Sequence, residues 1–170
     1  MHMEKLWSPW RSKYIDAFNE GTNETECIFC KMLYADPSND QNLVIDQAEY
    51  TLTVLNLYPY NTGHLMVVPK RHTSEFSELT NEELLESMKK LQLAQQALTK
   101  VSNPHGFNIG ANIGKISGAG IEDHIHFHIV PRWTGDTNFM PVLGEVKVIS
   151  QDLLDTKHRL IQAYQELKSK

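Results

Sequence analysis

The segment EDHIHFHIVPRW constrains the fold most, because its histidines and apolar residues alternate strictly. The residues between the histidines are Ile, Phe and Ile, which favour β structure. Side chains of a strand return to the same face with a period of two. The segment therefore predicts a strand with one face on the core and the other lined by three imidazoles, those of His124, His126 and His128.

A row of imidazoles on one face needs a chemical explanation. The chain has only 8 histidines in 170 residues, and three of them stand in this one segment. They would repel one another if all were protonated, so the row needs solvent, an anion or a metal. Histidine titrates near neutral pH, donates hydrogen bonds to anions and can attack phosphorus to form a covalent intermediate. A three-histidine zinc site is the rival, and the spacing leaves it open.

Further strands are expected on both sides of a central helix. Apolar runs with flanking turn residues predict strands at 43–45, 50–56, 64–70 and 107–114, and a short one at 146–150. Together with the histidine strand they predict an α+β fold with a mostly antiparallel sheet of about five strands.

Two main helices are expected around that sheet. Thr80 and Glu83 form a capping-box pattern at the start of a helix that runs to about Val101. Its apolar stripe consists of Leu84, Met88, Leu91, Leu98 and Val101. Ser150 is expected to cap a terminal helix, which carries Leu153, Leu154, Leu160, Ile161, Tyr164 and Leu167.

The length suits one domain, preceded by an aromatic arm at 1–26 and continuing from 27–135 into a C-terminal extension at 136–170. The formal net charge of −5 gives no broad basic surface for nucleic acid. No apolar run reaches the ~20 residues of a membrane span, and the first residues lack an apolar signal core. We therefore expect a cytoplasmic protein with no membrane or nucleic-acid partner.

The chain contains two cysteines, Cys27 and Cys30, in the segment CIFC. A disulfide framework would need more cysteines. The spacing fits a redox pair, half of a zinc site or two buried thiols, and alone it does not choose among them. The order of elements lacks the βαβ context that a thioredoxin-like redox pair would have.

The motif HIHFHIV resembles the signature of the histidine-triad nucleotide hydrolases and transferases, in which three histidines alternate with apolar residues. The segments CIFC and LNLYPYNTGHLMVVPKRH and the glycine-rich loop before the triad resemble that family in the same order. The segments LWSPWRSKYI and PRWTGDTNFMPVL look like the branch that contains diadenosine tetraphosphate phosphorylases. The resemblance implies a histidine-triad fold whose sheet extends across a homodimer.

The resemblance also implies roles for individual residues. His126 would be the nucleophile that carries the nucleotidyl group, with its other ring nitrogen donating to a backbone carbonyl of the same strand. His128 and His64 would contact phosphate oxygens, and Asn56 would bind the ribose. Further ligand contacts would come from Asn112 and from the glycine-rich loop GKISGAG, namely Ser117, Gly118 and Gly120.

Zinc-containing relatives imply a structural zinc site with four protein ligands, which here are Cys27, Cys30, His72 and His124. The implied function is a phosphorylase or hydrolase of dinucleoside polyphosphates that forms a nucleotidyl-histidine. A nucleoside phosphoramidase or general nucleotide hydrolase is an alternative of the same family. A nucleotide-binding scaffold with little turnover is an alternative of another class, although binding alone does not need a nucleophile.

Overall fold

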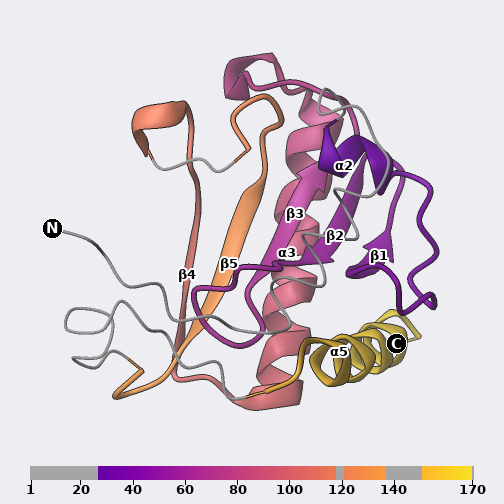
Figure 1. Ribbon diagram of the computed structural model, residues 1–170, viewed down its shortest axis with the longest axis vertical. Coiled ribbons are helices and arrows are strands. Elements are labelled where there is room, and N and C mark those ends of the chain that lie inside the picture. The colour runs from indigo at the N-terminus through magenta and orange to yellow at the C-terminus, as the bar shows by residue number, and fades with distance from the viewer. Residues whose placement is uncertain (1–26, 118–120, 137–150, 170) are drawn as a thin grey trace, which may run out of the picture. The chain divides into compact units, whose positions relative to one another are not determined.

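The computed structural model describes residues 27–117, 121–136 and 151–169. Within them five antiparallel strands form one sheet in the order β1-β2-β3-β5-β4 (Figure 1). The strands are β1 (Val44–Gln47), β2 (Thr51–Leu55), β3 (Leu65–Pro69), β4 (Gly106–Ala111) and β5 (Phe127–Arg132). The expected α+β class with a five-stranded antiparallel sheet is confirmed.

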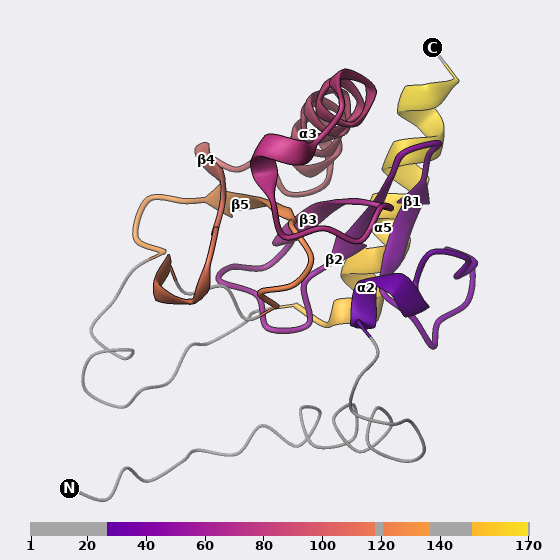
Figure 2. The same ribbon diagram turned by 90° about the horizontal axis from the view of Figure 1, so that it is seen from above.

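Two long helices pack with this sheet, as the sequence predicts. Helix α3 (Asn81–Ser102) contacts β2, β3 and β5, whereas α5 (Leu153–Lys168) contacts β1 and α3 (Figure 2). The short helix α2 (Ile28–Lys31) and two 3₁₀ turns, η1 (Phe76–Glu78) and η2 (Lys115–Ser117), complete the described elements. No helix in these residues combines the length and apolar character that a bilayer crossing requires.

The start of α3 is held by the expected capping box. The Thr80 side chain accepts from the backbone N–H of Glu83, and the Glu83 carboxylate accepts from the backbone N–H of Thr80. Arg71 donates to the same carboxylate, so the loop after β3 is tied to this helix end. The guanidinium and these hydrogen bonds hold the pKa of Glu83 below its ordinary value.

Two details of the expected helices are wrong. Met88 is 46% exposed, because the helix turns Ser87, Leu91, Ala94 and Leu98 toward the core instead. Helix α5 is capped by Asp152, whose carboxylate accepts from the backbone N–H groups of Leu154 and Asp155. A charged carboxylate at that position stabilises the first turn through both hydrogen bonds and the helix dipole. The expected cap Ser150 lies outside the described residues.

The strands also differ in their limits from those expected. Regular pairing of β5 begins at Phe127, so His128 is the one triad histidine inside the strand, and His124 and His126 come just before it. β1 includes Asp46 and Gln47, which the sequence places in a turn. The expected strand at 146–150 and the arm at 1–26 lie outside the described residues. The described residues belong to one compact unit.

The register of β3 against β5 brings His64 to the triad. Leu65 pairs with Ile129 and Met66 pairs with His128, so His64 stands immediately beyond the paired end of β3. The loop before it closes through a hydrogen bond from the His64 backbone N–H to the Asn61 carbonyl. Gly63 in this turn has φ +81°, a left-handed conformation that other residues rarely adopt.

Candidate active site and metal centre

His126 is 4% exposed, and its ring forms a hydrogen bond with the backbone. Its Nδ1 lies 2.9 Å from the carbonyl oxygen of His124. A carbonyl oxygen only accepts, so Nδ1 carries the proton and the lone pair of the neutral ring is on Nε2. The expected hydrogen bond to a nearby backbone carbonyl is confirmed. Burial lowers the pKa of His126, which keeps the ring in the neutral form that a nucleophile needs.

A directional chain of hydrogen bonds joins His64 to His128. The backbone N–H of Tyr60 donates to His64 Nδ1 at 3.1 Å, and Asn56 Nδ2 lies 3.3 Å from the same nitrogen. Because Nδ1 accepts, the proton of the neutral His64 ring is on Nε2. That nitrogen lies 2.9 Å from His128 Nδ1, which accepts in turn. The proton of the neutral His128 ring is therefore on Nε2.

The end of this chain is a donor without a partner. His128 Nε2 is buried, and no group among the described residues hydrogen-bonds to it. An unsatisfied buried N–H costs free energy, and its presence indicates a place where a ligand acceptor belongs. Burial, with a smaller contribution from His126, lowers the pKa of His128 from 6.5 to about 4. The group therefore remains a neutral donor at ordinary pH.

Two aromatic side chains enclose these histidines. The His126 ring lies between Phe29, at a centroid distance of 5.1 Å, and His128, at 4.8 Å. Tyr60 stacks on His64, with centroids 4.8 Å apart and an interplanar angle of 27°. Sequence reasoning missed both Phe29 and Tyr60 at the site. Their signals are positional, since Phe29 stands between the two cysteines and Tyr60 stands four residues before His64.

The four predicted metal ligands come together in one cluster. One ligand atom from each of Cys27, Cys30, His72 and His124 lies within 4.8 Å of the other three. His124 Nδ1 is 3.3 Å from Cys27 Sγ, and His72 Nδ1 is 3.3 Å from Cys30 Sγ. No disulfide joins these two cysteines. Two thiolates and two imidazoles are a donor set typical of tetrahedral zinc sites, so these residues could hold a metal ion.

The tautomer of His124 supports this fit. Its Nε2 lies 2.7 Å from the carbonyl oxygen of Pro69, so Nε2 donates and Nδ1 presents a lone pair to the two sulfurs. A backbone carbonyl behind a ligand imidazole is the usual second contact at metal sites. Burial lowers the pKa of His124, which also favours the neutral, metal-binding form. Because Pro69 ends β3, the cluster is attached to the strand next to the triad.

The remaining predicted ligand residues differ in how they lie relative to the histidines. Asn56 lies beside His64, as described above. Ser117 is exposed in η2, where its hydroxyl donates to the Gly114 carbonyl, and Asn112 is half-buried just after β4. Within the described residues no hydrogen bond joins Asn112 or Ser117 to the histidines. Gly118 and Gly120 lie outside the described residues.

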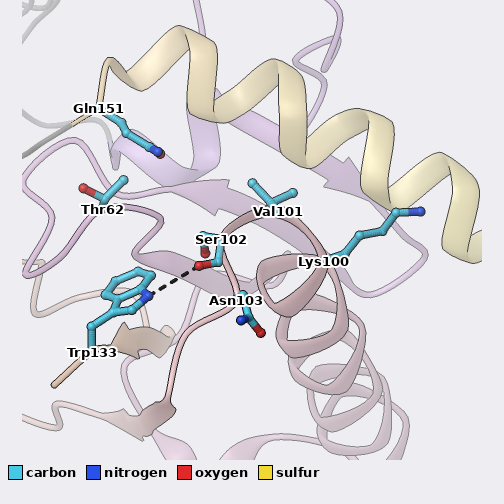
Figure 3. A pocket seen from close by; sticks show the side chains of 7 residues that line it. All are labelled: Thr62, Lys100, Val101, Ser102, Asn103, Trp133 and Gln151. Atoms are coloured by element: carbon cyan, nitrogen blue, oxygen red, sulfur yellow. Dashed lines mark hydrogen bonds between the residues drawn. The ribbon is translucent and has the colours of Figure 1, made fainter.

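A cavity of ≈ 530 Å³ lies elsewhere, beside the C-terminal end of α3 (Figure 3). The indole N–H of Trp133 donates to the Ser102 carbonyl at its edge. The cavity is lined by Thr62, Lys100, Val101, Ser102, Asn103, Trp133 and Gln151. None of these is a predicted site residue, so the chemistry is assigned to the histidines rather than to this cavity.

Comparison with known proteins identifies the family of the chain. The family model for the HIT domain matches residues 37–135, which is more than half of the chain. The chain belongs to the histidine-triad family. Members of this family are nucleotide hydrolases or transferases, and the chain is an enzyme of that class.

Relatives inside the family differ in their named activities. The AP-4-A phosphorylase of Mycobacterium tuberculosis is 41% identical over 161 residues, covering 93% of this chain and 83% of that protein. The adenosine 5'-monophosphoramidase hnt1 of Schizosaccharomyces pombe is 32% identical and covers 62% of this chain and 74% of its own length. Both comparisons connect the histidine-triad chain to nucleotide processing.

Solved structures give the same fold. A Zn-bound histidine triad family protein from Mycobacterium smegmatis superposes with a TM-score of 0.68 at 27% identity. The match covers 85% of this chain and 96% of that one. The fold expected from the histidine-triad resemblance is therefore confirmed.

Proposed function

We propose that this histidine-triad enzyme cleaves dinucleoside polyphosphates, such as diadenosine tetraphosphate, through a nucleotidyl group carried on His126. The observation that carries the proposal is the hydrogen bond from His126 Nδ1 to the His124 carbonyl, because it leaves Nε2 as the nucleophilic nitrogen. The 41% identity to a protein named AP-4-A phosphorylase supports this substrate class.

In the first step His126 Nε2 attacks the α-phosphorus, and a P–N bond forms. The bond from that phosphorus to the bridging oxygen breaks, and its electron pair leaves with the polyphosphate product. In the second step water or inorganic phosphate attacks the same phosphorus, and the electron pair of the P–N bond returns to Nε2. Attack by water gives a nucleoside monophosphate, and attack by phosphate gives a nucleoside diphosphate.

The His64–His128 pair stabilises the charge that develops on the phosphate oxygens. The unpaired Nε2–H of His128 donates to one of these oxygens, and the His64 ring fixes the direction of that donor. A donor preorganised in a buried site lowers the barrier because it needs no reorientation in the transition state. Asn56, which faces His64, is assigned to the ribose.

The cluster of Cys27, Cys30, His72 and His124 holds zinc in this proposal. Four protein ligands leave no open position, so the ion has a structural role. Zinc would connect helix α2 and its N-cap residue, the loop after β3 and the segment before β5. The Zn-bound relative from Mycobacterium smegmatis supports the choice of metal.

A homodimer is the proposed assembly, with the sheet extended through β4. This strand is at the end of the sheet and pairs only with β5 among the described residues. Its side chains include Ile109, which is 54% exposed. An exposed edge strand with an apolar side chain favours pairing with another strand. The molecular mass in solution, measured by light scattering, tests this part of the proposal.

The decisive experiment identifies the products of diadenosine tetraphosphate, with and without inorganic phosphate. ADP plus ATP, formed only with phosphate, indicates phosphorolysis, whereas AMP plus ATP indicates hydrolysis. Two ADP would contradict attack at the α-phosphorus. A parallel incubation with adenosine 5'-phosphoramidate tests the phosphoramidase alternative, which the 32% identical hnt1 relative favours. No turnover of either compound would leave the scaffold alternative.

A further inference from the structure

Phe29 is placed where the candidate metal cluster meets the nucleophile. It is fully buried and belongs to α2, the four-residue helix that lies between Cys27 and the following loop. Its ring is 5.4 Å from that of His124, in an edge-on arrangement, and 5.1 Å from that of His126. One apolar side chain therefore contacts both a candidate metal ligand and the candidate nucleophile.

The His126 ring has three neighbours that restrict its rotation. The His124 carbonyl accepts the proton on Nδ1, His128 lies at one side, and Phe29 lies at another. This hydrogen bond selects the tautomer, but a single hydrogen bond still permits the ring to rotate about the line that joins Nδ1 to the carbonyl oxygen. Packing of rings in a dense interior removes that remaining freedom.

We propose that Phe29 is a positioning residue that holds the His126 imidazole with Nε2 in line for attack on phosphorus. The inference rests on the proposed nucleotidyl-His126 chemistry and extends it to a residue outside the triad. It also links the two sites, because the Phe29 ring contacts both His124 and His126.

A residue that only fills the core makes a different prediction. Its removal would lower stability and leave the chemistry of the folded protein unchanged. A positioning residue instead changes the rate of nucleotidyl transfer while ligand affinity is kept, because a small misplacement of reacting atoms costs up to about 10²-fold in rate. The orientation of the His126 ring would change as well.

The experiment compares the parent with Phe29→Leu, and with Phe29→Met if the first variant does not fold. Single-turnover formation of the His126 adduct is followed by mass spectrometry with diadenosine tetraphosphate as substrate. We expect a rate about 10-fold lower, AMP affinity within about two-fold and zinc content equal to that of the parent. Leu160→Ala, a fully buried change in α5, is the control that loses stability and keeps the adduct rate.

Long-range ¹H–¹⁵N correlation of the His126 ring provides a readout that does not depend on turnover. The parent should show one tautomer with the proton on Nδ1. Tilting of the ring in Phe29→Leu would weaken the hydrogen bond from Nδ1 to the His124 carbonyl, so this variant should show averaging between two tautomers. An unchanged adduct rate with an unchanged tautomer in the variant overturns the inference. If the parent forms no adduct at all, the proposed function fails, and the tautomer comparison alone decides whether Phe29 positions the ring.

Discussion

Two groups of histidines lie side by side in this protein and have opposite chemical polarity. In the cysteine-containing cluster, His124 gives its N–H to the Pro69 carbonyl and turns a lone pair toward the thiols. In the neighbouring group, His128 accepts from His64, and its Nε2–H has no acceptor among the described residues. The first arrangement suits a cation and the second suits an anion.

The difference arises from the partner of the second ring nitrogen, since the residue type is the same. The Pro69 carbonyl accepts from one nitrogen of His124, so the other nitrogen is an acceptor. The Tyr60 backbone N–H donates to His64, which donates to His128, so the remaining nitrogen of His128 is a donor. His126 lies between these groups and follows the first pattern, because it gives its Nδ1–H to the His124 carbonyl and keeps the lone pair on Nε2. Four predictions test how far this separation holds.

The largest effect is expected from His126→Ala. Loss of the nucleophilic nitrogen should lower turnover by at least about 10⁴-fold, while nucleotide binding stays mostly intact because the His128 donor remains. Steady-state rates and equilibrium binding of AMP measure the two parts. The parent should also carry an added nucleotidyl mass on His126 after a quench at neutral to alkaline pH. Turnover near that of the parent would show that another group is the nucleophile.

The next effect concerns the donor on His128. His128→Phe removes the N–H and should lower the rate by about 10²-fold, whereas His128→Gln keeps an N–H donor and should lose less. The rate constants of both variants are compared with diadenosine tetraphosphate as substrate. Equal losses in the two variants would mean that shape, rather than the donated proton, matters at this position.

Cys27→Ser is expected to affect the metal cluster and leave the anion-facing group largely unchanged. Zinc content should fall, and the free energy of unfolding should drop by more than the roughly 0.5 kcal/mol of an ordinary surface change. Thiolates and imidazoles must lose protons to bind, so zinc occupancy in the parent should also fall in acid. Elemental analysis of protein purified without chelators is decisive, with Met32→Ser as the control from the same segment.

Catalysis in the folded fraction of Cys27→Ser should be largely kept, because the altered side chain does not contact substrate. A parent with less than a few tenths of a zinc per chain, as a rough threshold for partial occupancy, would contradict the zinc assignment. Cys27 and Cys30 would then be two thiols that hold no metal, and His124 would be available to the substrate.

The smallest effect is a pH dependence of stability. Burial lowers the pKa of folded His128 from 6.5 to about 4. Between these values the unfolded chain binds a proton that the folded chain does not, so this contribution is complete above pH 6.5 and is lost as the pH falls toward 4. Urea unfolding at pH 7 and 4.5 should show a larger loss for the parent than for His128→Gln. The same loss in both would refute this assignment.

Much of the fold follows from local patterns in the sequence. The capping box of Thr80 and Glu83 is encoded within four residues, and the alternation around the triad selects its buried face. Met88 was misplaced because apolar type alone does not show which side of a helix meets the sheet. Small residues such as Ala94 and Ala97 pack there instead, which permits close approach of helix and sheet.

Some features of the candidate site follow from the sequence, and others do not. The acceptor for the His126 N–H could be predicted, since a strand-like segment presents its own carbonyl two residues away. The polarity of the His64–His128 pair could not, because it depends on the backbone N–H of Tyr60, which carries no residue-specific signal. The proximity of Cys30 to His72 follows only from the family resemblance, since 42 residues separate them in the sequence.

Because Met66 pairs with His128, the hydrogen bond between His64 and His128 forms only when β3 and β5 pair in the correct register. A slip of β3 by one residue would turn His64 to the other face from His128, and a slip of two would separate the rings by about 6–7 Å along the strand. Either mispaired sheet could still be compact and apolar inside. Slow solvent exchange of the proton that His64 Nε2 donates to His128 would therefore distinguish the correctly registered protein from compact misfolded forms during refolding.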